Sequence, residues 1–316
     1  MHPLSCFFLL EKRTSYPSAS LSSVPGAPRT NDIMNLAIPE YVVSLILGHF
    51  KGDASSLDLC SRICRAFRAP CQRRLFSAVM LQDPDYGSTK LRGLFPKFLK
   101  LIQGSPYLGS YVEVLSINGI CDIYARPLLD PLLLASMLSL LPNLKQLDIT
   151  CVRLKPQPSD FAPNTPIPRP VIPLPRFNLN CLSLYGVGSE DDDTSGLCHV
   201  LNLFDTLKIL KLHTNVFLRD CAREKAVFPS NLRVTDLMVF TRPDVAPKAD
   251  FYYDFIRRTQ SRKTLKFVSA ECGNMADVAA VGKLLKQCGR NLSLIALCFN
   301  LTKADTVKGG ECLFMR

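Results

Sequence analysis

The chain has 316 residues, of which 47% are hydrophobic, so it is long enough for two domains and apolar enough to bury a substantial core. This composition excludes a chain that is disordered throughout, and no apolar run approaches the roughly 18 residues needed to cross a bilayer. The net charge of +11 is compatible with a nucleic-acid partner. The lysines and arginines are spread along the chain and accompany no nucleic-acid motif, however, so nucleic acid is not expected as the main partner.

The cysteines and histidines indicate neither a disulfide framework nor a metal site. The 13 cysteines are scattered, with no C-x-x-C pair, which is typical of reduced thiols in the cytoplasm or nucleus. None of the four histidines lies at a zinc-ligand spacing from paired cysteines. We therefore expect no metal, no cofactor and a cytoplasmic or nuclear protein.

The first segment, residues 1–33, is rich in serine and proline and is expected to be a disordered tail. Its short apolar piece, Leu4 to Leu10, has no basic residue before it and is followed directly by Glu11, Lys12 and Arg13. A secretory signal peptide has the opposite order of charge, so none is predicted.

Residues 34–76 predict three short helices. Pro39 and Glu40 are a favourable helix start, because proline lacks the amide that would be unpaired there and glutamate suits the positive end of the helix dipole. A second helix is expected to be capped by Ser55 or Ser56. The apolar residues fall at helical spacing in each piece: Val42, Val43, Ile46, Leu47 and Phe50, then Leu57 and Leu59, then Cys60, Ile63, Cys64 and Phe67.

This stretch resembles an F-box. The resemblance covers residues 36 to about 76 and rests on Pro39-Glu40, the apolar set Val43, Ile46 and Leu47, the pair Ser56-Leu57, and Cys64-Arg65-x-Phe67-Arg68, where the family usually has tryptophan in place of Phe67. The resemblance implies docking on the Skp adaptor of a cullin-based ubiquitin ligase. The implied adaptor contacts are Ile38, Pro39, Glu40, Ile46, Leu57 and Cys64. The alternative is a degenerate F-box that serves only as a helical cap on the following repeats.

From residue 76 onward, apolar residues recur at positions 1, 4 and 6 of a repeating unit. The clearest copy is Leu207, Leu210 and Leu212, followed by Asn215 and Leu218, which resembles the leucine-rich repeat pattern L-x-x-L-x-L-x-x-N-x-L. From Leu81 to Leu297 the intervals average about 31 residues, a period typical of a solenoid. The other copies are Phe76/Val79/Leu81, Val112/Leu115/Ile117, Leu144/Leu147/Ile149, Leu179/Leu182/Leu184, Val234/Leu237/Val239, Leu292/Ile295/Leu297 and an imperfect Arg262/Leu265/Phe267.

Helical patterns lie between most of these short strands, so the strands are expected to run parallel. The predicted fold class is α/β: a three-helix F-box, then over residues 77–316 an irregular leucine-rich-repeat solenoid with a parallel sheet inside and helices outside. The order of F-box and irregular repeats is similar to that of the F-box proteins of fungi. Residues 155–176 contain eight prolines and are expected to be a surface insertion, or else a proline-rich ligand for another domain.

Alternation along each strand places every second side chain on the inner, concave face of the solenoid. We expect the target protein to bind there, because exposed aromatic residues beside charges are typical of recognition surfaces. The expected contacts are Tyr185, Lys211, His213, Asp236, Met238, Phe240 and Lys266, with Gln146, Asp148, Cys181 and Ile209 on the same face.

The apolar tetrad Cys312 to Met315 is the last feature. We expect it either to fold back onto the helix predicted at Val278 to Leu285 as a cap, or to remain exposed with the edge of the last strand.

No catalytic constellation is present in the sequence. Gly282-Lys283 lacks the earlier glycine of a phosphate-binding loop, and Gly186-Val187-Gly188-Ser189 does not continue to a nucleophile elbow. The predicted function is therefore non-enzymatic, and the F-box resemblance implies the substrate-recognition subunit of a cullin-type ubiquitin ligase, with a Skp-type adaptor, and through it a cullin, as partners. The alternatives are a repeat protein that binds other proteins without any link to ubiquitin and an enzyme whose site is assembled across loops.

Overall fold

The computed structural model describes residues 39–50, 53–63, 65–82, 91–119, 126–155, 175–189, 195–213, 229–240, 249–299 and 312–315. The chain divides into two units, Met1–Phe76 and Ser77–Arg316. The expected tail at residues 1–33, most of the proline-rich insertion, and Asn215 lie outside the described residues. None of the described helices is long and apolar enough to cross a membrane.

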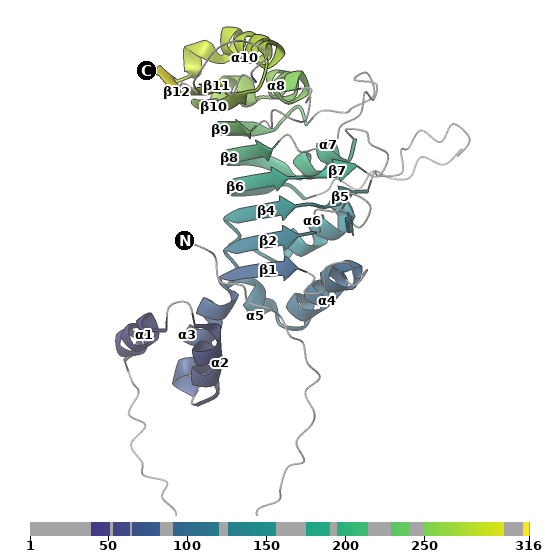
Figure 1. The fold of residues 1–316 in the computed structure, drawn as a ribbon. Coiled ribbons are helices and arrows are strands. Elements are labelled where there is room, and N and C mark those ends of the chain that lie inside the picture. The colour runs from purple at the N-terminus through teal and green to yellow at the C-terminus, as the bar shows by residue number, and fades with distance from the viewer. Residues whose placement is uncertain are drawn as a thin grey trace, which may run out of the picture. The chain divides into compact units, whose positions relative to one another are not determined.

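The described residues of the first unit form three helices, α1 (Glu40–Gly48), α2 (Ala54–Ile63) and α3 (Arg65–Phe76), shown in Figure 1. They enclose a small core of their own in which one or two residues from each helix are buried. The core residues are Val43, Leu47, Leu57 and Cys71, with Phe50, Cys60, Phe67 and Leu75 packed against them.

An arginine from α3 completes the end of α1. Helix α1 has no basic residue in its last turn, where the carbonyl groups carry partial negative charge. The Arg74 guanidinium donates from Nη1 to the carbonyl oxygen of Leu47 at 2.7 Å and from Nη2 to that of Ser44 at 3.1 Å. At least one basic residue of this stretch, Arg74, therefore stabilises the unit itself by joining α3 to α1.

The cap of α2 is Asp53, so the prediction that Ser55 or Ser56 caps this helix was wrong. The backbone amide of Ser56 donates to Asp53 Oδ1 at 3.0 Å, and the Ser56 hydroxyl donates to Asp53 Oδ2. A side chain caps the amides two or three residues after it, which is where Ser56 stands relative to Asp53. These hydrogen bonds, first the one from the Ser56 hydroxyl and then the one from its amide, lower the pKa of the Asp53 carboxyl below its ordinary value of 3.8.

This cap gives a pH-dependent prediction for α2. Because the pKa of Asp53 is lower in the folded protein, its stabilisation of α2 is present above pH 3.8 and is lost as the pH falls through the folded-state pKa. Hydrogen exchange of the α2 amides, followed by mass spectrometry, measures this loss. Asp53→Asn keeps a capping oxygen without the charge. In this variant the protection of the α2 amides against hydrogen exchange is therefore expected to change less with pH. Equal pH dependence of α2 protection in both proteins would contradict the prediction.

The second unit is built on a nine-stranded sheet in which the strands follow each other in chain order, as Figure 1 shows. Eight strands are parallel, each paired with the next one along the chain that belongs to this sheet, and the last strand is antiparallel. The strands are β1 (Ala78–Gln82), β2 (Val114–Asn118), β4 (Gln146–Thr150), β6 (Phe177–Tyr185), β8 (Phe204–His213), β9 (Arg233–Phe240), β10 (Phe267–Cys272), β11 (Leu294–Phe299) and β12 (Cys312–Met315). An α/β fold with a mostly parallel sheet is thus confirmed.

Helices accompany one face of this sheet. Figure 1 shows α4, α6 and α7 together on one side of the strand stack, and α4 packs on β1 while α10 packs on β10. The helices of this unit are α4 (Leu91–Gly104), α5 (Pro106–Gly109), α6 (Pro131–Ser139), α7 (Ser195–Leu201), α8 (Ala249–Arg258), α9 (Ser261–Thr264) and α10 (Met275–Cys288), with the 3-10 turn η1 (Gly289–Asn291).

The repeated triads align across the sheet in two rows. Positions 4 of the triads are direct partners on neighbouring strands, and so are positions 6. From β1 to β10 both rows are buried against the helical side. The rows are Val79, Leu115, Leu147, Leu182, Leu210, Leu237, Val268 and Ile295, and Leu81, Ile117, Ile149, Leu184, Leu212, Val239, Ala270 and Leu297.

The imperfect triad Arg262/Leu265/Phe267 was placed wrongly by three residues. The buried residues are Leu265, Val268 and Ala270, whereas Arg262 lies in α9 and is exposed. Helix α9 is held against the start of β9, because the Ser261 hydroxyl donates to the carbonyl oxygen of Leu232 at 3.0 Å and accepts from the amide of Val234 at 3.0 Å. The strand can begin only after this turn.

The C-terminal tetrad was also predicted in the wrong place. Cys312–Met315 forms β12, which pairs antiparallel with β11, Ile295 opposite Met315 and Cys298 opposite Cys312. It therefore lies along β11 and does not fold onto α10, which was the first expected placement. It also pairs with the β11 edge, which the second expected placement left unpaired. An edge strand has unpaired amide and carbonyl groups, and another strand can satisfy them more completely than a helix can.

A second, smaller parallel sheet joins β3 (Leu128–Leu129), β5 (Arg153–Leu154) and β7 (Gly188–Ser189). The chain passes from the large sheet to this one through left-handed backbone, at Cys151 (φ 52°) after β4 and at Gly186 (φ 59°) after β6. The two turns lie against each other, because the amide of Cys151 donates to the carbonyl oxygen of Tyr185 at 2.8 Å. Glycine adopts this conformation without strain, and it also leaves room for the Cys151 sulfur.

Candidate interaction surfaces

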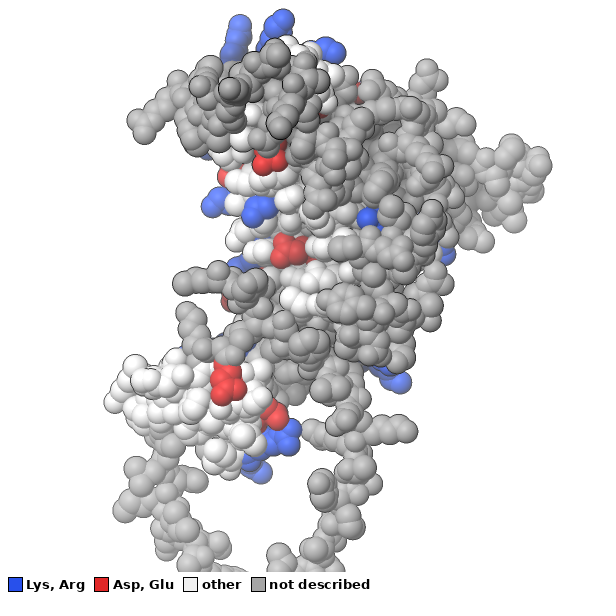
Figure 2. Space-filling model, viewed as in Figure 1, with Lys and Arg blue, Asp and Glu red and all other residues white. Residues whose placement is uncertain are grey.

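Two pairs of apolar side chains are exposed on the three-helix unit. Tyr41 and Leu45 are one turn apart on α1, and Leu59 and Ile63 are one turn apart on α2, so each pair forms an apolar stripe on its helix. Leu45 is 65% exposed and Ile63 is 74% exposed. Figure 2 shows that this unit is largely uncharged on the face in view. Exposed apolar residues on neighbouring turns of a helix are a common feature of protein-interaction surfaces.

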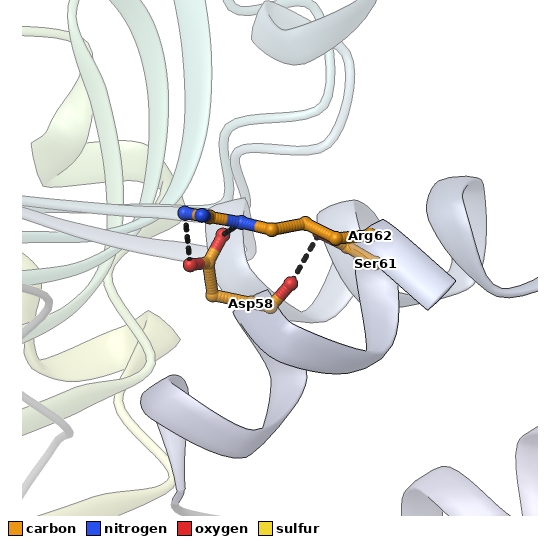
Figure 3. Close-up of polar contacts among 3 residues, drawn as sticks. All are labelled: Asp58, Ser61 and Arg62. Atoms are coloured by element: carbon orange, nitrogen blue, oxygen red, sulfur yellow. Dashed lines mark hydrogen bonds and ion pairs between the residues drawn. The ribbon is translucent and has the colours of Figure 1, made fainter. Parts of the chain in front are cut away.

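A polar strip runs along α2 next to the stripe of Leu59 and Ile63. Figure 3 shows the Arg62 guanidinium reaching back to the Asp58 carboxylate, and the Ser61 hydroxyl donating to the carbonyl oxygen of Asp58 at 2.7 Å. An exposed ion pair at this spacing stabilises a helix by only about 0.3–0.5 kcal/mol. Its effect is mainly to hold Arg62 along its own helix.

The predicted adaptor contacts differ in how far their side chains are exposed. Pro39 is exposed and Ile46 is 38% exposed, so both are accessible. Leu57 is only 5% exposed and belongs to the core of the unit, so little of its side chain is accessible to a partner. Ile38 and Cys64 lie outside the described residues, and only the backbone of Glu40 is described.

The exposed stripe could not be read from periodicity alone. Ile63 was assigned to an apolar helix face together with Cys60, yet in the structure it points to solvent while Cys60 packs on the core. Residues three apart on a helix are separated by about 60° around its axis, so a narrow core reaches one and not the other. The sequence did contain one signal for an exposed stripe: this stretch has more apolar residues than so small a core can bury.

The second surface is the face of the large sheet opposite the helices, which we call the open face. Its residues alternate with the buried rows and are mostly half-buried. Three rings lie in a row on it, at the ends of β6, β8 and β9. The centroids of Tyr185 and His213 are 5.1 Å apart with the rings edge to face, and those of His213 and Phe240 are 4.4 Å apart and stacked.

The predicted open-face residues Tyr185, His213 and Phe240 are thus brought into direct contact. Burial, followed by the positive charge of Lys211, lowers the pKa of His213 below 6.5, so its ring is neutral at neutral pH. A neutral imidazole between a phenol and a phenyl ring forms a continuous aromatic surface. Apolar and planar groups of a partner pack favourably on such a surface.

Polar groups lie between this aromatic row and the starts of the strands. Asp148 on β4 accepts from Gln146 Nε2 at 2.9 Å and from the Ser116 hydroxyl at 3.4 Å. Lys211 on β8 pairs in register with Met238 on β9, and Ile209 with Asp236. Burial raises the pKa of the Cys181 thiol, with a smaller opposing effect of Lys211, so this sulfur is not a reactive thiolate.

Sequence reasoning missed three residues of this face on β10. Phe267, Ser269 and Glu271 alternate with the buried Val268, Ala270 and Cys272. They were missed because the triad was shifted, and the same shift put Lys266 in their place. Lys266 lies directly before β10 and is exposed, and its amide donates to the carbonyl oxygen of Thr235 at 2.7 Å.

No group of three or more potential metal ligands occurs within the described ranges. Comparison with the models of known protein families gives no match, and comparison with curated proteins gives none either. The described residues thus present an apolar surface on the small helical unit and a polar and aromatic surface on the mostly parallel α/β unit.

Proposed function

We propose that the protein is a substrate-recognition subunit of a cullin-type ubiquitin ligase. The three-helix unit acts as an F-box that docks on a Skp-type adaptor, and the second unit is a leucine-rich-repeat-like solenoid that holds the target protein. The observation that carries the proposal is the pair of exposed apolar stripes, Tyr41 with Leu45 and Leu59 with Ile63, on a unit that already has its own core. A partner that covers them removes this apolar area from water.

The strand order supports the solenoid part of the proposal. Each parallel strand from β1 to β11 joins the sheet on the same side as the one before it. Crossover connections between parallel strands are right-handed, so a sheet extended in one direction keeps all its connections on one face. The other face remains available for a target, as in repeat proteins that bind partners along their strands. The recruited enzyme performs the chemistry, so the proposed role requires no catalytic residue in this chain.

Binding of the full chain to a purified Skp-type adaptor tests the proposal. The unmodified protein is expected to bind, and Leu45→Asp or Ile63→Asp is expected to weaken binding at least tenfold, because a carboxylate buried without a partner at an interface is strongly unfavourable. Both side chains are exposed, so the substitutions leave the core intact. Isothermal titration calorimetry measures the change.

Met275→Asp is the matched control, because Met275 is an equally exposed apolar residue on α10 of the second unit. It should bind the adaptor as the unmodified protein does. Failure of the unmodified protein to bind, or an equal loss in all three variants, would remove the ligase role. The chain would then be a protein-binding repeat module with no link to ubiquitin.

A further inference from the structure

The open face carries more negative than positive charge. Its charged side chains on the described strands are Asp148 on β4, Asp236 on β9 and Glu271 on β10, against Lys211 alone on β8. His213 adds no positive charge at neutral pH, because burial, and then Lys211, lowers its pKa. The whole chain, in contrast, has a net charge of +11. The open face is therefore an acidic surface on a basic protein.

The basic residues where the strands begin belong to another part of the surface. Lys208, Arg233 and Lys266 are exposed, and along their strands they alternate in step with the buried rows and not with the aromatic row. They are therefore not part of the open face.

One of the carboxylates adjoins the aromatic row. Ala270 on β10 pairs with Val239 on β9. The next residues, Glu271 and Phe240, therefore lie level with each other on strands about 4.8 Å apart. His213 stacks on Phe240 from β8, which is the neighbour of β9 on the side away from β10. One face of the Phe240 ring is thus covered by His213, and the other is turned toward the strand that carries Glu271.

An aromatic face beside a carboxylate is a favourable place for an arginine side chain. The planar guanidinium stacks on the ring, and its N–H groups donate to the carboxylate in a bidentate geometry. A carboxylate has about four acceptor sites, so Glu271 can hold a guanidinium beside another donor.

The lysine of the open face is too far away to oppose a cation at this place. Lys211 is level with Met238, so it lies two strands and two residues from Glu271, a backbone separation of roughly 12 Å. Charges in contact with water are largely screened beyond about 8 Å at physiological salt.

Asp236 offers a second anchor on the same strand as Phe240. It lies four residues before Phe240, about 13 Å along β9, and forms no ion pair with the described residues. An extended peptide along β9 with basic side chains four positions apart spans this distance. Because the spacing is even, both side chains point from the peptide to the same side.

We infer that the target segment held by the open face is an extended basic peptide with two arginines four residues apart. One arginine stacks on Phe240 and donates to Glu271, and the other pairs with Asp236. The excess of carboxylates on this face favours such a segment over an acidic one. This inference deepens the proposed function, since it rests on the use of the open face for target binding.

A fluorescein-labelled synthetic peptide tests the inference by anisotropy titration of the full chain. The peptide has about ten residues, with two arginines four positions apart among uncharged residues. Saturable binding that weakens as salt is added is expected, because exposed charge pairs are screened. A peptide of the same composition with its arginines three positions apart directs them to opposite sides, so it should bind about threefold or more weakly.

Two double variants separate local contacts from net charge. Asp236→Asn with Glu271→Gln is expected to weaken binding of the arginine peptide about tenfold or more, because both charge-assisted hydrogen bonds are lost. Glu113→Gln with Asp205→Asn makes the same change in charge on two exposed carboxylates where the strands begin, and should have a smaller effect.

Phe240→Leu tests the stacking separately, because leucine keeps an apolar side chain without an aromatic face. It is expected to weaken binding of the arginine peptide about threefold or more. A peptide with alanine in place of the stacked arginine should bind both proteins equally. Unchanged binding of the arginine peptide to Phe240→Leu would contradict the inference.

Four further outcomes would overturn the inference: no saturable binding of the arginine peptide up to about 1 mM, equal binding of a peptide with glutamates in place of the arginines, equal binding at both spacings, or an equal loss in both double variants. The Leu45→Asp and Ile63→Asp proteins should bind the peptide normally. Peptide binding without adaptor binding would therefore refute the ligase role and leave this inference standing. Adaptor binding without peptide binding would do the reverse.

Discussion

Replacing Leu210 by alanine is expected to lower the free energy of unfolding by about 2–5 kcal/mol. Leu210 is fully buried in the middle of the sheet, with its partners Leu182 on β6 and Leu237 on β9 equally buried on either side. The substitution removes three carbons from a packed row, and the neighbouring strands cannot move together to fill the cavity, because backbone hydrogen bonds hold them at their spacing. Both the lost burial and the cavity therefore lower the stability.

Urea unfolding followed by far-UV circular dichroism measures this change, since the chain contains no tryptophan for fluorescence. Leu132→Ala on α6 is the matched control, because it removes the same three carbons from a side chain that is 48% exposed and lies outside the core. Its effect is expected to stay below about 1 kcal/mol. Similar midpoints for the two variants would show that the aligned rows do not carry the stability of the sheet.

Replacing Asp277 by alanine is expected to lower the free energy of unfolding by about 2–4 kcal/mol. Asp277 is 1% exposed and lies in the first turn of α10, where its Oδ2 accepts from the amide of Gly273 at 2.9 Å. Its own amide donates to Asn274 Oδ1 at 3.0 Å. The Asn274 and Asp277 side chains therefore each accept a hydrogen bond from a backbone amide at the start of α10. Alanine leaves the buried Gly273 amide without this acceptor and removes a negative charge from the positive end of the helix.

Asp130→Ala is the matched control for this change. Asp130 caps α6 by accepting from the amide of Leu132 at 2.8 Å, but its side chain is 38% exposed, so water can replace it. We expect a loss of about 1 kcal/mol there. Thermal unfolding compares the two variants, and a loss at Asp130 as large as that at Asp277 would mean that burial of the carboxylate does not matter.

The positions of most strands could be predicted because their cause is local. A strand with one face buried must alternate apolar and exposed residues, so the spacing around Leu210 or Leu147 indicates a strand wherever it occurs. The same alternation predicted that Tyr185, His213 and Phe240 share a face. It could not predict that their rings touch, because contact depends on the register between strands.

The sequence was ambiguous where two registers fitted equally well. Leu265 and Phe267 are both apolar, and the local pattern does not say which of them faces the core. Hydrogen bonds to β9, about 30 positions earlier, decide it by fixing both ends of α9: those of Ser261 to Leu232 and Val234 hold its start, and the one from the Thr264 hydroxyl to the carbonyl oxygen of Val234 holds its end. The open-face residues of β10 followed from these contacts and not from the pattern.

The sequence by itself determined the alternation of strands and helices, the apolar rows and the absence of a long apolar span. Only the tertiary structure decided that Leu57 is core while Leu45 and Ile63 are exposed, that Arg74 completes α1, and that Cys312–Met315 pairs with β11. The physical reason is that periodicity follows from the geometry of one element, whereas burial, capping by a distant side chain and strand pairing depend on which segments meet in space.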